Sequence, residues 1–146
     1  MEQVFFDQPI NNETIINSLE FLFPELIVFH WDFMEDCPAE LDTNNKKHIF
    51  FNTDLYEDIK EFSFLLSIYQ TPNKDEEERA FYIAMYFERT MNIRTLVTFQ
   101  HPAHPNDPYY DIIFMNGNSY LADDCDTNWG DGTKELIKII EPYSIP

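Results

Sequence analysis

The sequence predicts an α+β fold: a mostly antiparallel sheet of five or six strands, with three or four helices packed on one face. Short β-branched and aromatic runs recur between turn residues, and segments with apolar residues at helical spacing lie among them. An Asn-Gly pair joins two of the strand-like runs and is typical of a tight hairpin. With 146 residues, 44% of them hydrophobic, the chain is expected to form one domain, residues 1–146, around a sizeable core.

The N-terminal segment is expected to form a strand and then a helix. Met1–Phe6 is the expected strand. Asn11 or Asn12 is placed to cap a helix over Glu13–Phe23, because its apolar residues follow the spacing of one buried helical face. A proline directly after Phe23 ends this helix.

The next three segments are expected to be two strands and a second helix. Leu26–Phe33 is β-branched and aromatic, which favours a central strand, and His48–Asn52 is expected to pair with it in antiparallel fashion. Thr53 is then placed to cap a helix over Asp54–Tyr69. This helix is predicted from a stripe of apolar residues at helical spacing: Leu55, Ile59, Phe62, Leu66 and Tyr69.

Two interpretations remain for the segment that ends at Met91. Asp75, followed three residues later by Glu78, resembles a capping box, and the apolar residues after it share one helical face. Phe81–Phe87, however, is apolar on all sides and would also suit a buried strand. We favour the helix.

Three further strands and one helix complete the prediction. The expected strands are Ile93–Gln100, Tyr109–Met115 and Ser119–Ala122. Asn116 and Gly117 form the hairpin turn between the last two of these strands. A final helix is expected over Thr133–Ile140, and it stops at Pro142.

The charge of the chain excludes several functions. Nine Lys and Arg residues oppose 27 Asp and Glu residues, and the net charge is −18. Such a surface repels the phosphates of nucleic acids and the headgroups of anionic membranes, so neither is an expected partner. No apolar run is long enough to cross a bilayer, and the N-terminal residues lack the features of a signal peptide. Two cysteines, Cys37 and Cys125, are expected to be reduced thiols of a cytoplasmic protein.

The acidity is concentrated in the first third of the chain, where a candidate binding surface lies. Residues 1–45 have a net charge of −10 and contain no Lys or Arg, whereas residues 46–100 have a net charge of −2. Carboxylates beside exposed aromatic side chains are what a basic protein partner requires, because the rings supply buried contact area and the charges steer the encounter. The candidate partner-binding residues are Trp31, Asp32, Phe33, Glu35, Asp36, Glu40 and Asp42. The alternative is a strand end followed by an ordinary solvated loop.

A second acidic stretch follows Ala122, and its carboxylates are further candidates for partner binding: Asp123, Asp124, Asp126 and Asp131. Four of its oxygen-bearing residues match positions 1, 3, 5 and 12 of a calcium-binding loop: Asp124, Asp126, Asn128 and Glu135. Trp129 stands where that loop requires glycine, and Asp131 stands where it is usually apolar. We therefore favour a solvated acidic loop and expect no metal site.

The remaining polar residues do not predict an enzyme. His101, His104 and Asp107 resemble a metal-ligand set, but the prolines between them hold an extended backbone that spreads the side chains apart. Neither cysteine has a neighbouring histidine in the sequence, and three glycines form no phosphate-binding loop. We expect no catalytic site and no cofactor.

A small, acidic, cysteine-poor chain without a catalytic signature resembles the immunity proteins of bacterial toxin systems, including contact-dependent growth inhibition. The resemblance is one of general character and not of motif. It implies tight binding to a cognate toxin domain, often a basic nuclease, whose active site an acidic surface blocks. Two alternatives remain: a nucleic-acid mimic that inhibits a DNA-binding or restriction protein, and a small metal-binding module that uses the Asp124 loop. Oligomeric state is open.

Overall fold

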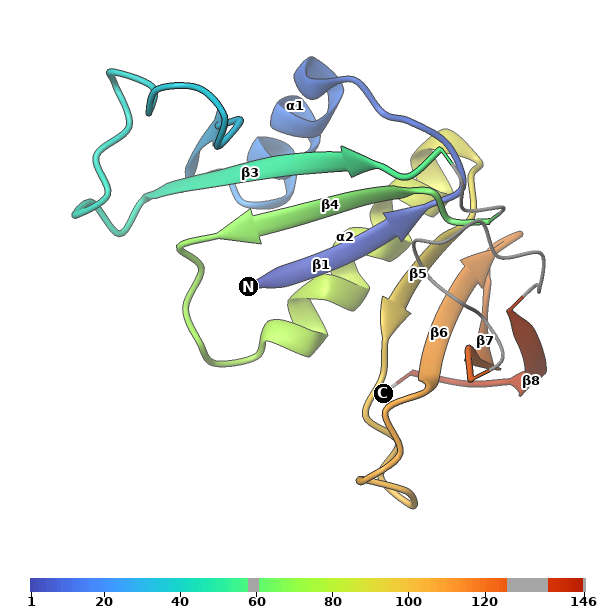
Figure 1. The fold of residues 1–146 in the computed structure, drawn as a ribbon. Coiled ribbons are helices and arrows are strands. Elements are labelled where there is room, and N and C mark those ends of the chain that lie inside the picture. Colours follow the sequence, from blue (N-terminus) through green and yellow to red (C-terminus); the bar gives the residue numbers. More distant parts are fainter. Residues whose placement is uncertain (58–60, 126–136, 146) are drawn as a thin grey trace.

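The computed structural model describes residues 1–57, 61–125 and 137–145. Eight strands and two helices follow one another along these residues (Figure 1). They are β1 (Glu2–Phe6), α1 (Asn12–Leu22), β2 (Ile27–His30), β3 (His48–Leu55), β4 (Phe64–Tyr69), α2 (Glu76–Met91), β5 (Thr95–Thr98), β6 (Tyr110–Met115), β7 (Asn118–Asp123) and β8 (Lys138–Pro142).

All eight strands belong to one sheet, in the order β2-β3-β4-β1-β5-β6-β7-β8. Every neighbouring pair is antiparallel except β2 and β3, which run parallel. The predicted α+β class and the mostly antiparallel sheet are confirmed. The predicted numbers are wrong: the described chain has eight strands instead of five or six, and two helices instead of three or four.

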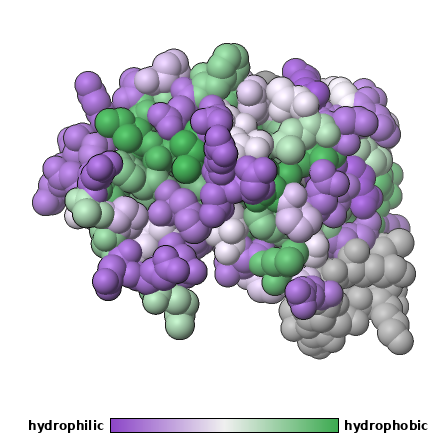
Figure 2. Space-filling model, turned by 90° about the horizontal axis from the view of Figure 1, so that it is seen from above, coloured by the Kyte–Doolittle hydropathy of each residue, from purple (hydrophilic) through white to green (hydrophobic). Residues whose placement is uncertain are grey.

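Both helices lie on the same face of the sheet (Figure 1). α2 packs over β1, β5 and β6, and α1 packs against β2 and touches α2. Alternate residues of the strands point into this main core, where the Phe6 and Phe87 rings meet edge to face with centroids 5.1 Å apart. Seen from above, the outer surface shows separate hydrophobic areas divided by hydrophilic side chains (Figure 2).

The opposite face of the sheet is also covered over much of its width. A smaller cluster there joins residues of β5, β6 and β7 to two residues outside the strands: Phe62, Leu96, Ile113, Ala122 and Ile137. Burial on both faces explains why β4 and β6 contain runs of consecutive buried side chains and not an alternating pattern.

Several local predictions are confirmed. The Asn11 side chain accepts a hydrogen bond from the Thr14 backbone N–H at 2.8 Å, which caps α1. The ambiguous segment before Met91 is the helix α2. Asn116 and Gly117 have φ angles of 53° and 76°, the positive values that a tight hairpin of this kind requires.

The helix predicted over Asp54–Tyr69 is wrong. β3 extends to Leu55, the Tyr56 backbone N–H donates to the Ser63 carbonyl at 2.8 Å, and β4 returns from Phe64. A strand that is buried on both faces carries apolar residues at nearly every position, so helical spacings occur in it by chance. Ile59 lies outside the described residues.

β2 was predicted as a central strand, antiparallel to β3, and both parts of this prediction are wrong. β2 lies at the edge of the sheet, and its residues pair in parallel register with β3, from Ile27 opposite His48 to His30 opposite Phe51. Parallel neighbours need a crossover connection, which here is the segment 31–47. The length of that segment was the sequence feature that could have indicated parallel pairing, because an antiparallel hairpin needs only a short turn.

The predicted final helix and the predicted capping box are also wrong in the part of the chain that the structure describes. The final helix was predicted over Thr133–Ile140, but Lys138–Pro142 is the edge strand β8, and residues 133–136 lie outside the described residues. Asp75 does precede α2, but it has a left-handed φ of 63°, and its side chain does not cap the helix as the predicted capping box requires.

We expect Phe87→Ala to lower the free energy of unfolding by about 3 to 5 kcal/mol, because it removes a fully buried ring from the main core. Urea unfolding measures this change. Phe21→Ala is the matched control, because its side chain is 71% exposed, and its loss should stay below about 1 kcal/mol. Equal losses in the two variants would contradict the placement of Phe87.

Candidate functional site

Four aromatic side chains form a cluster on the sheet face opposite the helices. Phe50 of β3 and Tyr69 of β4 are register partners and stack, with centroids 5.2 Å apart and planes inclined by 14°. The ring centroid of Trp31, directly after β2, lies 5.1 Å from that of Phe50. The centroid of the Phe33 ring lies 5.0 Å from that of Trp31 and 5.3 Å from that of Tyr69. The start of the β2–β3 connection therefore folds back over this end of the sheet.

The outer members of the cluster remain in contact with solvent. The Phe50 side chain is buried, whereas Phe33 is 49% exposed and the neighbouring Met34 is 93% exposed. Phe33 stays half-exposed while its ring packs on this aromatic layer, so it is suited to contact a partner, since its position is fixed before binding.

Hydrogen bonds within the β2–β3 connection, and one to His48 at the start of β3, hold this segment in place. The Asp32 carboxylate accepts from the Met34 backbone N–H at 3.0 Å, and the Trp31 indole N–H donates to the Glu35 carbonyl at 3.2 Å. At the far end, the Asp42 backbone N–H donates to Nδ1 of His48 at 3.0 Å. Side-chain turns of this kind order a loop without regular secondary structure.

Direct contacts link Trp31 to Phe33 and to Glu35, and the other sequence-predicted residues lie on the same connection without a hydrogen bond to these rings. We call the whole set the acidic aromatic surface: Trp31, Asp32, Phe33, Glu35, Asp36, Glu40 and Asp42. All five carboxylates are exposed. The ion pairs of the described chain involve Glu76, Glu2, Asp7 and Glu61, and none includes a carboxylate of this surface. Within the described chain, no ion pair therefore neutralises these carboxylates directly.

The second predicted acidic surface is described only in part. Asp123 ends β7 and Asp124 follows it, with both side chains half-buried, whereas Asp126 and Asp131 lie outside the described residues. The Asp124 backbone N–H donates to the Tyr109 carbonyl at 2.9 Å, which fixes this chain segment against the start of β6.

Asp111 joins Asp123 and Asp124, and the sequence interpretation missed it. It lies on β6, opposite Ala122 of β7, with 1% of its surface exposed. Burial raises the pKa of the Asp111 carboxyl from 3.8 to about 9; the negative charge of Asp124, a hydrogen bond with Asp124 and the charge of Asp123 act in the same direction. Asp111 is therefore protonated at neutral pH. The sequence did contain a signal for a buried carboxyl here, because Asp111 is the one acidic residue in the otherwise apolar run of residues 109–115.

The described residues contain no group of three or more His, Cys, Asp or Glu side chains arranged to hold a metal ion. Of the four residues that match the calcium-loop template, Asp124 alone lies in the described part of the chain. The hydrogen bond between Asp111 and Asp124 instead points to a shared proton between these two carboxyl groups.

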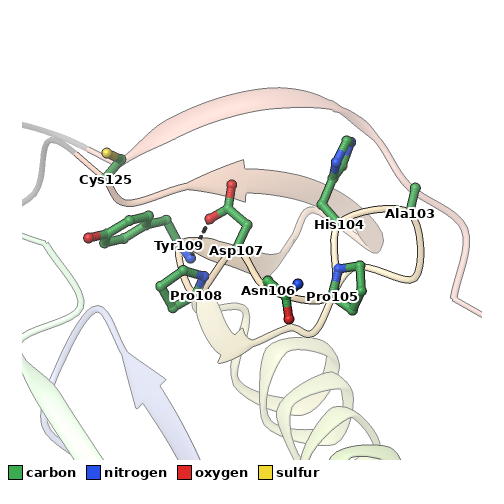
Figure 3. A pocket seen from close by; sticks show the side chains of 8 residues that line it. All are labelled: Ala103, His104, Pro105, Asn106, Asp107, Pro108, Tyr109 and Cys125. Carbon is green, nitrogen blue, oxygen red and sulfur yellow. Dashed lines mark hydrogen bonds between the residues drawn. The ribbon is translucent and has the colours of Figure 1, made fainter.

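The proline-rich loop between β5 and β6 borders a shallow cavity of about 720 Å³ (Figure 3). His104, Asp107 and Cys125 all line it, but His104 and Cys125 lie at opposite ends and their side chains point apart. The Asp107 carboxylate accepts from the Tyr109 backbone N–H at 3.0 Å. His104 instead stacks on Tyr110, with centroids 5.9 Å apart. In this cavity, no histidine is placed to activate the Cys125 thiol.

Neither helix of the described chain combines the length and the apolar character that crossing a bilayer requires. Comparisons with protein-family models, with curated proteins and with solved structures found no match to this chain.

We expect Asp111→Asn to stabilise the protein at neutral and alkaline pH. The unfolded chain releases the Asp111 proton near its ordinary pKa of 3.8, whereas the folded protein keeps it until about pH 9. The favourable contribution of the protonated Asp111 to the free energy of unfolding is therefore fully present below pH 3.8. It is lost progressively as the pH rises from 3.8 towards about 9. Removing the acid should add on the order of 4 kcal/mol at pH 7.

Urea unfolding between these two pH values measures the effect. The difference between Asp111→Asn and the wild type should grow with pH, while the exposed control Asp36→Asn should follow the wild type throughout. A difference that does not change with pH over this range would show that the folded protein does not hold the Asp111 proton.

Proposed function

We propose that this protein is an immunity-type inhibitor that binds a basic, nuclease-type toxin domain through the acidic aromatic surface. The observation that carries the proposal is the exposed Phe33, seated on a packed aromatic cluster and bordered by carboxylates without ion-pair partners in the described chain. The resemblance in size, acidity and composition to immunity proteins supports the same conclusion.

The two kinds of side chain would have different tasks in such a complex. Phe33 and Met34 would bury apolar area at the centre of the interface, where most binding energy resides. The carboxylates of Asp36, Glu40 and Asp42 would attract the basic partner over a distance and accelerate the encounter. Since the cationic groups of a nuclease cleft bind substrate phosphates, carboxylates placed against them would exclude the substrate.

A nucleic-acid mimic would need carboxylates spaced along an extended face, like successive phosphates. In this protein five exposed carboxylates lie on one connection beside the exposed Phe33, and the other exposed carboxylates are distributed over separate elements, among them α1, α2 and β8. That arrangement favours a compact protein interface, and we prefer it to mimicry of a duplex.

The proposal is tested first by finding the partner. The reading frame next to the gene should encode a basic, toxin-like C-terminal domain that copurifies with this protein when the two are coexpressed. The protein should also abolish the activity of that domain. A neighbouring basic domain that neither binds this protein nor is inhibited by it would contradict the proposal.

Charge reversal tests the role of the carboxylates. In that complex, Asp36→Lys combined with Glu40→Lys should slow association at low ionic strength by about tenfold or more, because steering attraction becomes repulsion. Stopped-flow or surface-plasmon kinetics measure the rate. Glu20→Lys combined with Glu25→Lys is the matched control, since it changes the net charge equally at exposed positions around the end of α1. Equal slowing in both variants would indicate attraction by the whole protein and not by this surface.

Truncation of the exposed ring tests the apolar contact. Phe33→Ala should weaken the complex by about 2 kcal/mol or more, mainly through faster dissociation. The free energy of unfolding should change by less than about 1 kcal/mol, because the ring is half-exposed in the free protein. If Phe33→Ala leaves dissociation unchanged, the interface lies elsewhere, and the surface around Asp123 and Asp124 is the next candidate.

A further inference from the structure

We propose that a groove between α2 and the segment 143–145 binds a peptide segment of a protein partner, one that presents a large apolar side chain flanked by Lys or Arg. The groove lies on the helical face of the sheet, whereas the acidic aromatic surface lies on the opposite face. The inference is thus independent of the function proposed above.

The groove has the size and the lining of a binding site. Its volume is about 810 Å³, within the range of roughly 300 to 1,000 Å³ that is usual for ligand pockets. α2 contributes Phe81, Tyr82 and Met85 to the lining, and Phe99, Tyr143 and Ile145 complete its apolar part.

The floor of the groove is formed before any ligand binds. Phe99 lies between Phe81, at 6.0 Å, and Tyr143, at 5.2 Å from centroid to centroid. Both phenylalanine side chains are buried, whereas Tyr82 on the rim is 55% exposed. An apolar side chain that entered the groove would therefore meet fixed aromatic surface, with little loss of conformational entropy in the protein.

The charge at one end of the groove defines the ligand further. Asp75, Glu77 and Glu78 all line it, and Arg79 is its one Lys or Arg among the described residues. Arg79 is already engaged: its Nε lies 2.7 Å from the buried Glu2 carboxylate, and its other nitrogens donate to the Lys74 and Pro72 carbonyls. Arg79 therefore does not neutralise the three carboxylates of the groove.

Two of these carboxylates remain available to a ligand. Glu77 accepts a hydrogen bond from the Gln100 backbone N–H at 3.2 Å. Asp75 does not cap α2, and within the described chain neither Asp75 nor Glu78 has a side-chain hydrogen bond or an ion pair. The N-terminus of α2 contributes only about half a positive charge, so the end of the groove stays negative.

An apolar floor beside a negative rim selects a specific chemistry. The floor favours an aromatic or long aliphatic side chain, and the rim favours a cation one or two residues away in the same peptide. Phosphorylated or acidic segments would be repelled.

The test uses a fluorescein-labelled Gly-Arg-Phe-Leu-Arg-Gly peptide and the full-length protein, with binding followed by fluorescence anisotropy at low ionic strength. Replacing both arginines by citrulline keeps the shape of the peptide and removes its charge. Asp75→Asn combined with Glu78→Gln should weaken binding of the arginine peptide by about three- to tenfold and leave the citrulline peptide unaffected. Glu20→Gln combined with Glu25→Gln, exposed and distant in sequence, is the matched control and should change neither.

Two-dimensional NMR locates the peptide. Shift changes should centre on backbone amides of α2 and of residues 99–100 and 143–145, and Met85→Trp, which fills the groove, should abolish them. Shifts centred on residues 31–42 would overturn the proposal, as would equal weakening by the control pair or binding that Met85→Trp leaves intact. The folded state of each variant is checked in the same spectra.

Discussion

The pairing of β1 with two other strands is the constraint on which the rest of the structure depends. β1 pairs with β4 along its whole length and with β5 over Phe5 and Phe6, so it alone joins the two halves of the described sheet. Its buried Glu2 carboxylate binds Arg79 of α2 and the Thr71 hydroxyl, which ties the helix to this junction. These contacts join residues that are more than 50 positions apart in the sequence, and the main core is complete only when the first strand is in place.

The central position of β1 also determines where surfaces for binding remain. Helices cover one face of the sheet, and the smaller cluster around Ile113 closes part of the other. The aromatic cluster around Phe50 covers the second face near the β2 edge, and the Asp111 carboxyl lies near the opposite end of the sheet. The start of the β2–β3 connection is therefore anchored on the sheet through Trp31 and Phe33, an anchor that a free loop would lack.

The sequence predicted those features that depend on local chemistry. The Asn11 cap and the Asn116-Gly117 turn each rest on residues that are close in the chain, and so does the contact between the Trp31 and Phe33 rings. The failures arose where tertiary contacts decide the structure. β4 is covered on both faces, so its apolar pattern does not distinguish a strand from a helix. The environment of Asp111 depends on β7 and on Asp124, which only the fold brings to it.

The parallel pairing of β2 with β3 has a consequence for how this protein can diversify. A crossover between parallel neighbours must be long enough to return along the strands, but its sequence is not otherwise constrained by the sheet. Most side chains of residues 31–47 are exposed, with Leu41 buried among them, so most substitutions there leave the core unchanged. Selection for a new partner can thus act on this segment separately from selection for a stable fold.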